Sequence, residues 1–257
     1  MIGDVLGWLT DPAHAADIGR RLLEHLEYTL VAVLVAAIIA VPLGLWIGHT
    51  GRGKVLVVTL AGAARAIPTL GLLYFVVLFL GPRLSGDLAF YLPNELVLVI
   101  LAVPPILSGV YAGIDEVDPA ARDAAKGMGM RGLEVLRKVE VPVALPLMLS
   151  GLRSAFLQVI ATATIAATAA LGGLGRFLID GLAVRDYTQM ASGALLVALL
   201  AIVVDLVLAT VQRLVVSPGV SGRVDRRAGR GRGGSPETAD PAEAAVSTHR
   251  PALPTSA

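Results

Sequence analysis

Long runs of uncharged residues dominate the chain. Five of these runs are long enough for a helix to cross the roughly 30 Å hydrocarbon core of a bilayer, which takes about 20 residues. They cover residues 28–48, 55–82, 96–114, 141–175 and 187–212. The strands of a membrane β-barrel would be roughly 10 residues long with alternating polarity, and these runs are longer and do not alternate. The pattern therefore predicts an all-α integral membrane protein with five spanning helices.

A shorter amphipathic pattern precedes the first run. Asp11 and Pro12 can serve as the cap and the first turn of a helix. Four apolar residues that follow would form a stripe along this helix: Ile18, Leu22, Leu23 and Leu26. We expect residues 1–24 to form an N-terminal segment that contains this helix, which would be a sixth span if it enters the membrane.

The end of the chain has a different composition. From about residue 217, Gly, Arg, Pro, Ser, Ala and Thr dominate and the apolar periodicity is lost. We expect residues 217–257 to be a disordered cytoplasmic tail with a weak attraction for anionic lipid headgroups. Residues 25–216 are then the transmembrane domain.

The amino-acid composition excludes several classes of function. The 257 residues are 55% hydrophobic and only 16% charged, and the mean hydropathy is +0.75. There are no cysteines, which excludes disulfides and cysteine chemistry, and the four histidines lie far apart, so no metal site is expected. A formal net charge of +1 gives no indication of nucleic-acid binding.

The distribution of basic residues predicts the orientation. Fourteen of the 21 Lys and Arg residues follow the first, third and fifth runs, and five lie on the opposite side. Cytoplasmic loops carry the excess of positive charge, so the N-terminus is predicted outside and the C-terminus in the cytoplasm.

Two glycine-rich stretches resemble nucleotide-binding motifs. Residues 48–54 satisfy the first part of the phosphate-loop pattern, but Val55 stands where a hydroxyl must reach magnesium, and a membrane span replaces the preceding strand. Residues 127–132 read G-x-G-x-x-G, but a helical segment precedes them instead of a strand. We therefore expect no bound nucleotide, no other cofactor and no catalytic activity in this chain.

The connection between the third and fourth runs, residues 115–142, is the most informative segment. Asp118 and Pro119 should begin a short helix that extends through Lys126, and Gly127 and Gly129 should end it. The result would be an amphipathic projection beneath the membrane. Small side chains at positions 124 and 125 would let another protein approach the backbone closely.

The spacing within this connection resembles the permease subunits of ATP-binding-cassette importers. Their cytoplasmic loop has the pattern E-A-A, three residues, G, nine residues, I-x-L-P. The same intervals separate Asp123-Ala124-Ala125, Gly129 and Val139-Glu140-Val141-Pro142. In that family the loop is a coupling helix that docks on the ATPase subunit. The resemblance therefore implies an ATPase-coupling role for Asp123, Ala124, Ala125, Gly129 and Pro142, and a methionine-importer-like permease fold.

The similarity extends over about residues 22–215 and is closest to permeases for glycine betaine, carnitine and choline. Residues 66–70, Ala-Ile-Pro-Thr-Leu, and residues 172–175, Gly-Gly-Leu-Gly, carry it together with the loop. Arg65 departs from that subgroup, which often has Gln there, whereas methionine-importer permeases can carry Arg. The resemblance implies three protein partners: a pair of ATPase subunits, an extracytoplasmic solute-binding protein and a second permease, identical or paralogous.

Three charged residues interrupt the apolar runs: Arg65, Arg153 and Asp205. A charge at the bilayer centre costs roughly 2.5–3.5 kcal/mol, so each should face protein or a wet cavity. Each is a candidate for the transport pathway or for an internal ion pair, and Asp205 could neutralise one of the arginines. In an alternative class, an ion-coupled secondary transporter, Asp205 would be the coupling group. The 12 aromatic residues are scattered, and no cage for a quaternary ammonium is visible in the sequence.

Overall fold

The computed structural model describes residues 2–55, 57, 59, 62 and 66–216, and all regular elements within them are helices. The helices are α1 (Ile2–Thr10), α2 (Pro12–Thr50), α4 (Thr69–Leu80), α5 (Leu88–Asp115), α6 (Pro119–Gly127), α7 (Gly132–Val135), α8 (Val141–Ala166), α9 (Gly175–Val184) and α10 (Tyr187–Val215). A π-helical turn, Leu136–Glu140, joins α7 to α8, and short 3₁₀ turns cover Gly81–Arg83 and Ala167–Ala169. The all-helical prediction is confirmed for this part of the chain.

Four helical stretches are long and apolar enough to span a membrane: Pro12–Thr50, Leu88–Asp115, Gly132–Ala169 and Tyr187–Val215. They contain the first, third and fifth predicted runs and residues 141–169 of the fourth. The second run lies partly outside the described residues, and within them its apolar helix is the shorter α4. The predicted tail, residues 217–257, also lies outside the described residues.

The start of α2 follows the sequence prediction closely. The Asp11 carboxylate accepts a hydrogen bond from the backbone N–H of Ala13 at 2.9 Å, and Pro12 occupies the first turn. The helix then continues without interruption to Thr50. The amphipathic segment and the first span are therefore one helix, and α1 is a separate element before them.

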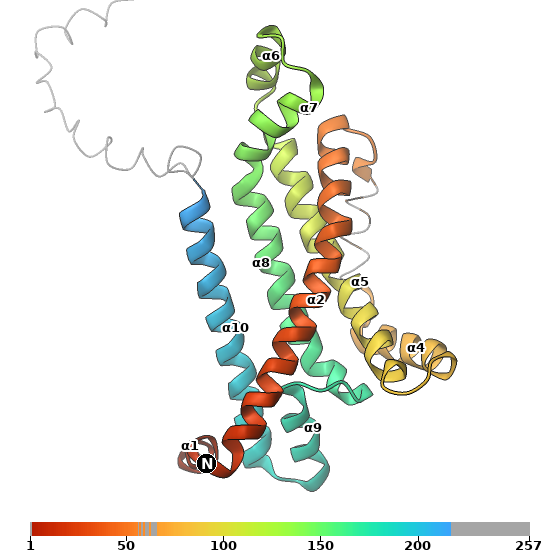
Figure 1. The fold of residues 1–257 in the computed structure, drawn as a ribbon, viewed down its shortest axis with the longest axis vertical. Helices are drawn as coiled ribbons and strands as arrows, with labels where there is room; N and C mark the ends of the chain where they lie inside the picture. Colours follow the sequence, from red (N-terminus) through yellow and green to blue (C-terminus); the bar gives the residue numbers. More distant parts are fainter. Residues whose placement is uncertain (1, 56, 58, 60–61, 63–65, 217–257) are drawn as a thin grey trace, which may run out of the picture. The chain divides into compact units, whose positions relative to one another are not determined.

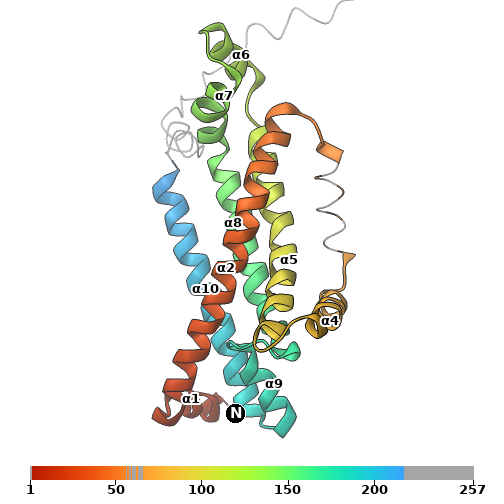
Figure 2. The ribbon, with the colours of Figure 1, turned by 45° about the vertical axis from the view of Figure 1, so that its right-hand side comes forward.

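Helix α5 lies at the centre of the bundle and packs against α2 on one side and α8 on the other (Figures 1 and 2). Its apolar side chains Val97, Leu98 and Ala102 are fully buried. Glycines allow the backbones to approach: a Cβ on Gly109 of α5 would lie 2.7 Å from the Cα of Gly151 on α8. Small residues at such contacts are the usual means of close helix packing in membranes.

The outer helices build a second, smaller core. Phe177 of α9 packs with Ile160, Leu174 and Leu200, and the Trp8 ring of α1 lies edge-on to Phe177 with 5.3 Å between ring centroids. Along α10, by contrast, many large apolar side chains are exposed. A helix that is apolar on its outward face is suited to contact with lipid or with another membrane helix.

Candidate coupling loop and polar cavity

Helix α6 begins and ends as its residues predict. The Asp118 carboxylate accepts from the N–H of Ala120 at 2.8 Å and caps the helix. At the other end, the N–H of Met130 donates to the carbonyl of Ala125 at 3.2 Å, and Gly129 has φ +88°. A residue with a Cβ rarely adopts this backbone conformation, so glycine sets the direction in which the chain turns back.

The motif residues on α6 differ in exposure. The Asp123 side chain is 78% exposed and lies 3.6 Å from the ammonium of Lys126. Ala124 is exposed, whereas Ala125 is only 2% exposed and packs against its own chain. Ala125 thus lies on the inward face of the helix and Ala124 on the outward face, and the coupling role of both stays a prediction.

After the glycine turn, the chain re-enters a helix and continues into the membrane. The N–H of Arg131 donates to the Glu134 carboxylate at 3.0 Å, which fixes the start of α7. The helical path then runs from Gly132 through the π turn into α8. Pro142 is the second residue of α8 and has no N–H to donate to the preceding turn, which is the π turn. The loop is therefore continuous with a membrane helix.

A buried carboxylate lies at the base of the loop. The Glu140 side chain is 2% exposed, its Oε1 lies 2.9 Å from Nε of Arg122 on α6, and its Oε2 accepts from Nδ1 of His49 on α2 at 2.6 Å. Arg122 also donates through Nη2 to the carbonyl of Ile114 at the end of α5. The sequence analysis did not single out Glu140. The signal that could have found it is a charge inside the otherwise apolar stretch 139–143.

Two of the three charged residues within the apolar runs form an ion pair. Arg153 of α8 donates through Nε and Nη2 to the two carboxylate oxygens of Asp205 on α10. The expected neutralisation of Asp205 by an arginine is thus present, and the partner is Arg153. Arg65 lies outside the described residues.

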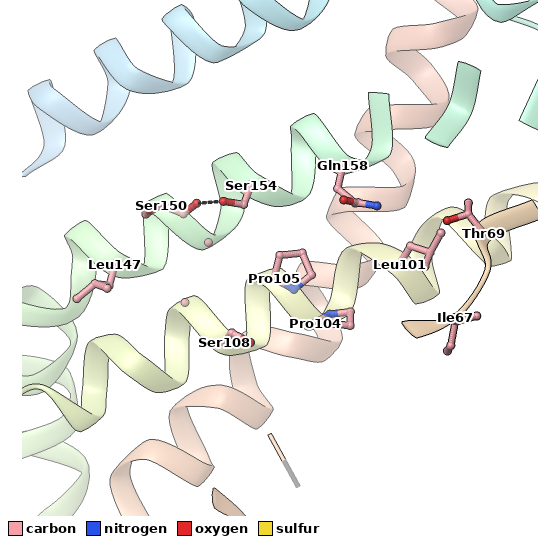
Figure 3. A pocket seen from close by; sticks show the side chains of 12 residues that line it. Ile67, Thr69, Leu101, Pro104, Pro105, Ser108, Leu147, Ser150, Ser154 and Gln158 are labelled. Carbon is pink, nitrogen blue, oxygen red and sulfur yellow. Dashed lines mark hydrogen bonds between the residues drawn. The ribbon is translucent and has the colours of Figure 1, made fainter. Parts of the chain in front are cut away.

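A cavity of about 660 Å³ opens between α5 and α8 (Figure 3). Its polar groups are hydroxyls and an amide from Thr69, Ser108, Ser150, Ser154 and Gln158, and the remaining lining is apolar or glycine. It is lined by Ile67, Thr69, Leu101, Pro104, Pro105, Ser108, Gly109, Leu147, Ser150, Gly151, Ser154 and Gln158. Neither Arg153 nor Asp205 is among these residues, and the sequence analysis had not identified the hydroxyls.

The sequence of residues 40–217 matches the family described as the binding-protein-dependent transport system inner membrane component. The chain belongs to this family. The permease is 35% identical over 77% of its length to the glycine betaine/carnitine/choline transport system permease protein OpuCB of Bacillus subtilis, of which the match covers 88%. It is 33% identical over 84% of its length to the osmoprotectant import permease protein OsmW of Salmonella typhimurium, of which the match covers 99%.

Solved structures agree on the fold of the permease. Inward-facing structures of the MetNI methionine ABC transporter match 81% of this chain and 100% of theirs, with a TM-score of 0.69 and 20% sequence identity. The methionine-importer-like fold and the permease function of an ATP-binding-cassette importer, both predicted from the sequence, are therefore confirmed. The chain is a multi-pass protein of the inner membrane.

Proposed function

We propose that this permease carries quaternary-ammonium osmoprotectants such as glycine betaine, carnitine or choline into the cell. The observation that carries the proposal is the similarity, at 32–35% identity over most of the chain, to relatives named for these solutes. The complex would contain a dimeric ATPase, an extracytoplasmic solute-binding protein and a second permease. The ATPase would hydrolyse ATP, and the N-terminus would lie outside with the C-terminus in the cytoplasm.

The loop built by α6 and α7 would be the surface that receives the ATPase. Asp123 and Ala124 are exposed on α6, and Gly129 turns the chain so that α6 and α7 project together from the bundle (Figure 1). Ala125 would hold α6 against the rest of the loop, and Pro142 would begin the membrane helix that receives the motion. The two short helices would then move as one unit when the ATPases close on ATP.

The cavity between α5 and α8 would form one wall of the solute pathway. Its described lining carries no charged side chain, so it offers weak hydrogen bonds to a zwitterion and no counter-charge for the trimethylammonium group. Weak binding suits a pathway in which the external receptor supplies the affinity, because tight binding in the membrane would slow release. Arg153 and Asp205 neutralise each other between α8 and α10, so the proposal gives them a structural role.

Reconstitution and purification test this proposal together. Affinity purification in mild detergent, followed by mass spectrometry, should recover an ATPase and a solute receptor. Uptake of radiolabelled glycine betaine should need internal ATP and survive collapse of the ion gradients. Carnitine or choline should compete for uptake, and methionine should not. Uptake driven by an ion gradient, or blocked by methionine alone, would contradict the proposal.

A loop variant tests the coupling surface. Gly129→Glu places a large, charged side chain at φ +88° on the exposed turn, so it should abolish uptake while leaving membrane insertion intact. Gly19→Glu is the matched control, since a side chain there meets nothing within 4 Å and Gly19 lies far from the loop in α2. Equal uptake by the two variants would argue against the coupling role.

A further inference from the structure

Four elements meet at the Glu140 side chain. Glu140 ends the π turn before α8, His49 comes from the end of α2, and Arg122 comes from α6. Arg122 extends the cluster to α5 through the carbonyl of Ile114. The cluster therefore joins the projecting loop to the cytoplasmic ends of three membrane helices.

The side chains in this cluster are buried or mostly buried, which raises the cost of removing any one of them. The side chains of Glu140, Arg122 and His49 are 2%, 21% and 26% exposed. A buried carboxylate is tolerated only with partners that replace its lost hydration, and removing one partner leaves an uncompensated charge. The Lys54–Asp115 pair nearby is 60% and 49% exposed, and such a pair contributes little. Removing the Glu140 carboxylate should therefore disturb these elements more than breaking the exposed pair would.

Helix α6 has few other attachments to the bundle. It packs mainly against α7 and the π turn, and Ala125 is the one buried residue within it. Apolar packing therefore connects α6 to its own loop. Residues 116–118 join it to α5 through the backbone, and among the described side chains Arg122 links it to the Ile114 carbonyl of α5 and, through Glu140, to His49 of α2.

We propose that Glu140 is a positioning residue that makes α2 move together with the coupling loop and with α5 and α8, which the backbone already joins to that loop. The inference rests on the proposed coupling function of that loop. With the carboxylate in place, a displacement of α6 pulls on three helices at once. Without it, the loop can still bind the ATPase and move α5 and α8 through the backbone, but α2 loses its bond to the loop.

A distance measurement tests the attachment in the permease alone. The chain has no cysteines, so Met128→Cys in the loop and Ile38→Cys on α2, both at exposed positions, would be its only sites for nitroxide labels. In lipid nanodiscs the Glu140→Gln variant should give a broader distribution of label distances than the parent. Glu116→Gln, a matched change at an exposed position before α6, should leave the distribution unchanged.

Transport efficiency provides the second readout. In proteoliposomes with the ATPase and the receptor, Glu140→Gln should lower the glycine betaine carried per ATP hydrolysed about tenfold, a factor typical of disrupted coupling networks. Complex assembly and ATP hydrolysis should persist. Arg122→Lys keeps the charge but cannot reach both Glu140 and the Ile114 carbonyl, so it should lower the same ratio. If Glu140→Gln does not assemble, Arg122→Lys is the variant that tests the positioning role.

The outcomes separate this inference from the proposed function. Unchanged distance distributions in Glu140→Gln and Arg122→Lys, or a transport-to-ATP ratio equal to that of the parent in both, would overturn the positioning role. A parent complex that shows no ATP-dependent uptake would instead contradict the proposed function. Broader distributions in the variants would still establish the attachment in that case.

Discussion

Replacing Gly109 by alanine should force α5 and α8 apart. A Cβ at this position would lie 2.7 Å from the Cα of Gly151, 2.8 Å from the carbonyl oxygen of Leu147 and 3.0 Å from the N of Gly151. All three are backbone atoms, so no side chain can rotate out of the way. The helices must separate by several tenths of an ångström before the contact is acceptable.

The size of the effect follows from this geometry. Inserting a methyl group into a packed contact costs about 1–3 kcal/mol. The higher helix propensity of alanine returns up to about 1 kcal/mol. A net loss of about 1–2 kcal/mol corresponds to a fall in Tm of roughly 2–8 °C for a domain of this size. Because Gly109 and Gly151 also line the cavity, uptake should fall as well.

Thermal unfolding in detergent, followed by the fluorescence of Trp8 and Trp46, measures this change. Gly19→Ala is the control, because it makes the same substitution within a helix and meets nothing within 4 Å. It should raise the Tm by a few degrees through helix propensity alone. If Gly109→Ala is as stable as Gly19→Ala, the close approach of α5 and α8 described above is wrong.

Two further changes test other contacts. Asp205→Asn should lower the Tm, because it leaves the Arg153 guanidinium without its counter-charge. The exchange of the two residues, Arg153→Asp with Asp205→Arg, should recover folded protein measured by size-exclusion chromatography, and a failure to recover would argue against the pair. Gly173→Ala should lower the free energy of unfolding by at least about 1–2 kcal/mol, since Gly173 has φ +83° and an added Cβ would meet His25 Nδ1 at 3.0 Å. An unchanged Tm would refute this prediction.

Local signals in the sequence were sufficient for the helices and the loop. Each confirmed span follows from an apolar run of about 20 residues or more with at most one charge, because only a helix satisfies its backbone within a bilayer. The same holds for α6, where Asp118 provides the cap and Gly129 the turn. These features depend on residues close together in the chain, so their chemistry can be interpreted without knowledge of the packing.

The functional contacts depend on residues far apart in the chain. His49 and Glu140 are 91 positions apart, and Arg153 and Asp205 are 52 positions apart. Their meeting is set by the angles and registers at which α2, α8 and α10 cross, and no local pattern encodes these. The same applies to the cavity, whose hydroxyls come from α4, α5 and α8 and are ordinary in each helix alone.

The sequence by itself thus determined a helical membrane permease with a loop that turns at a glycine, because bilayer solvation and backbone conformation act residue by residue. Only the tertiary structure decided that Ala125 points inward, that Arg153 neutralises Asp205 and that Glu140 meets Arg122 and His49. Each of these outcomes is decided by which helix faces pack together, and packing is a property of several segments at once.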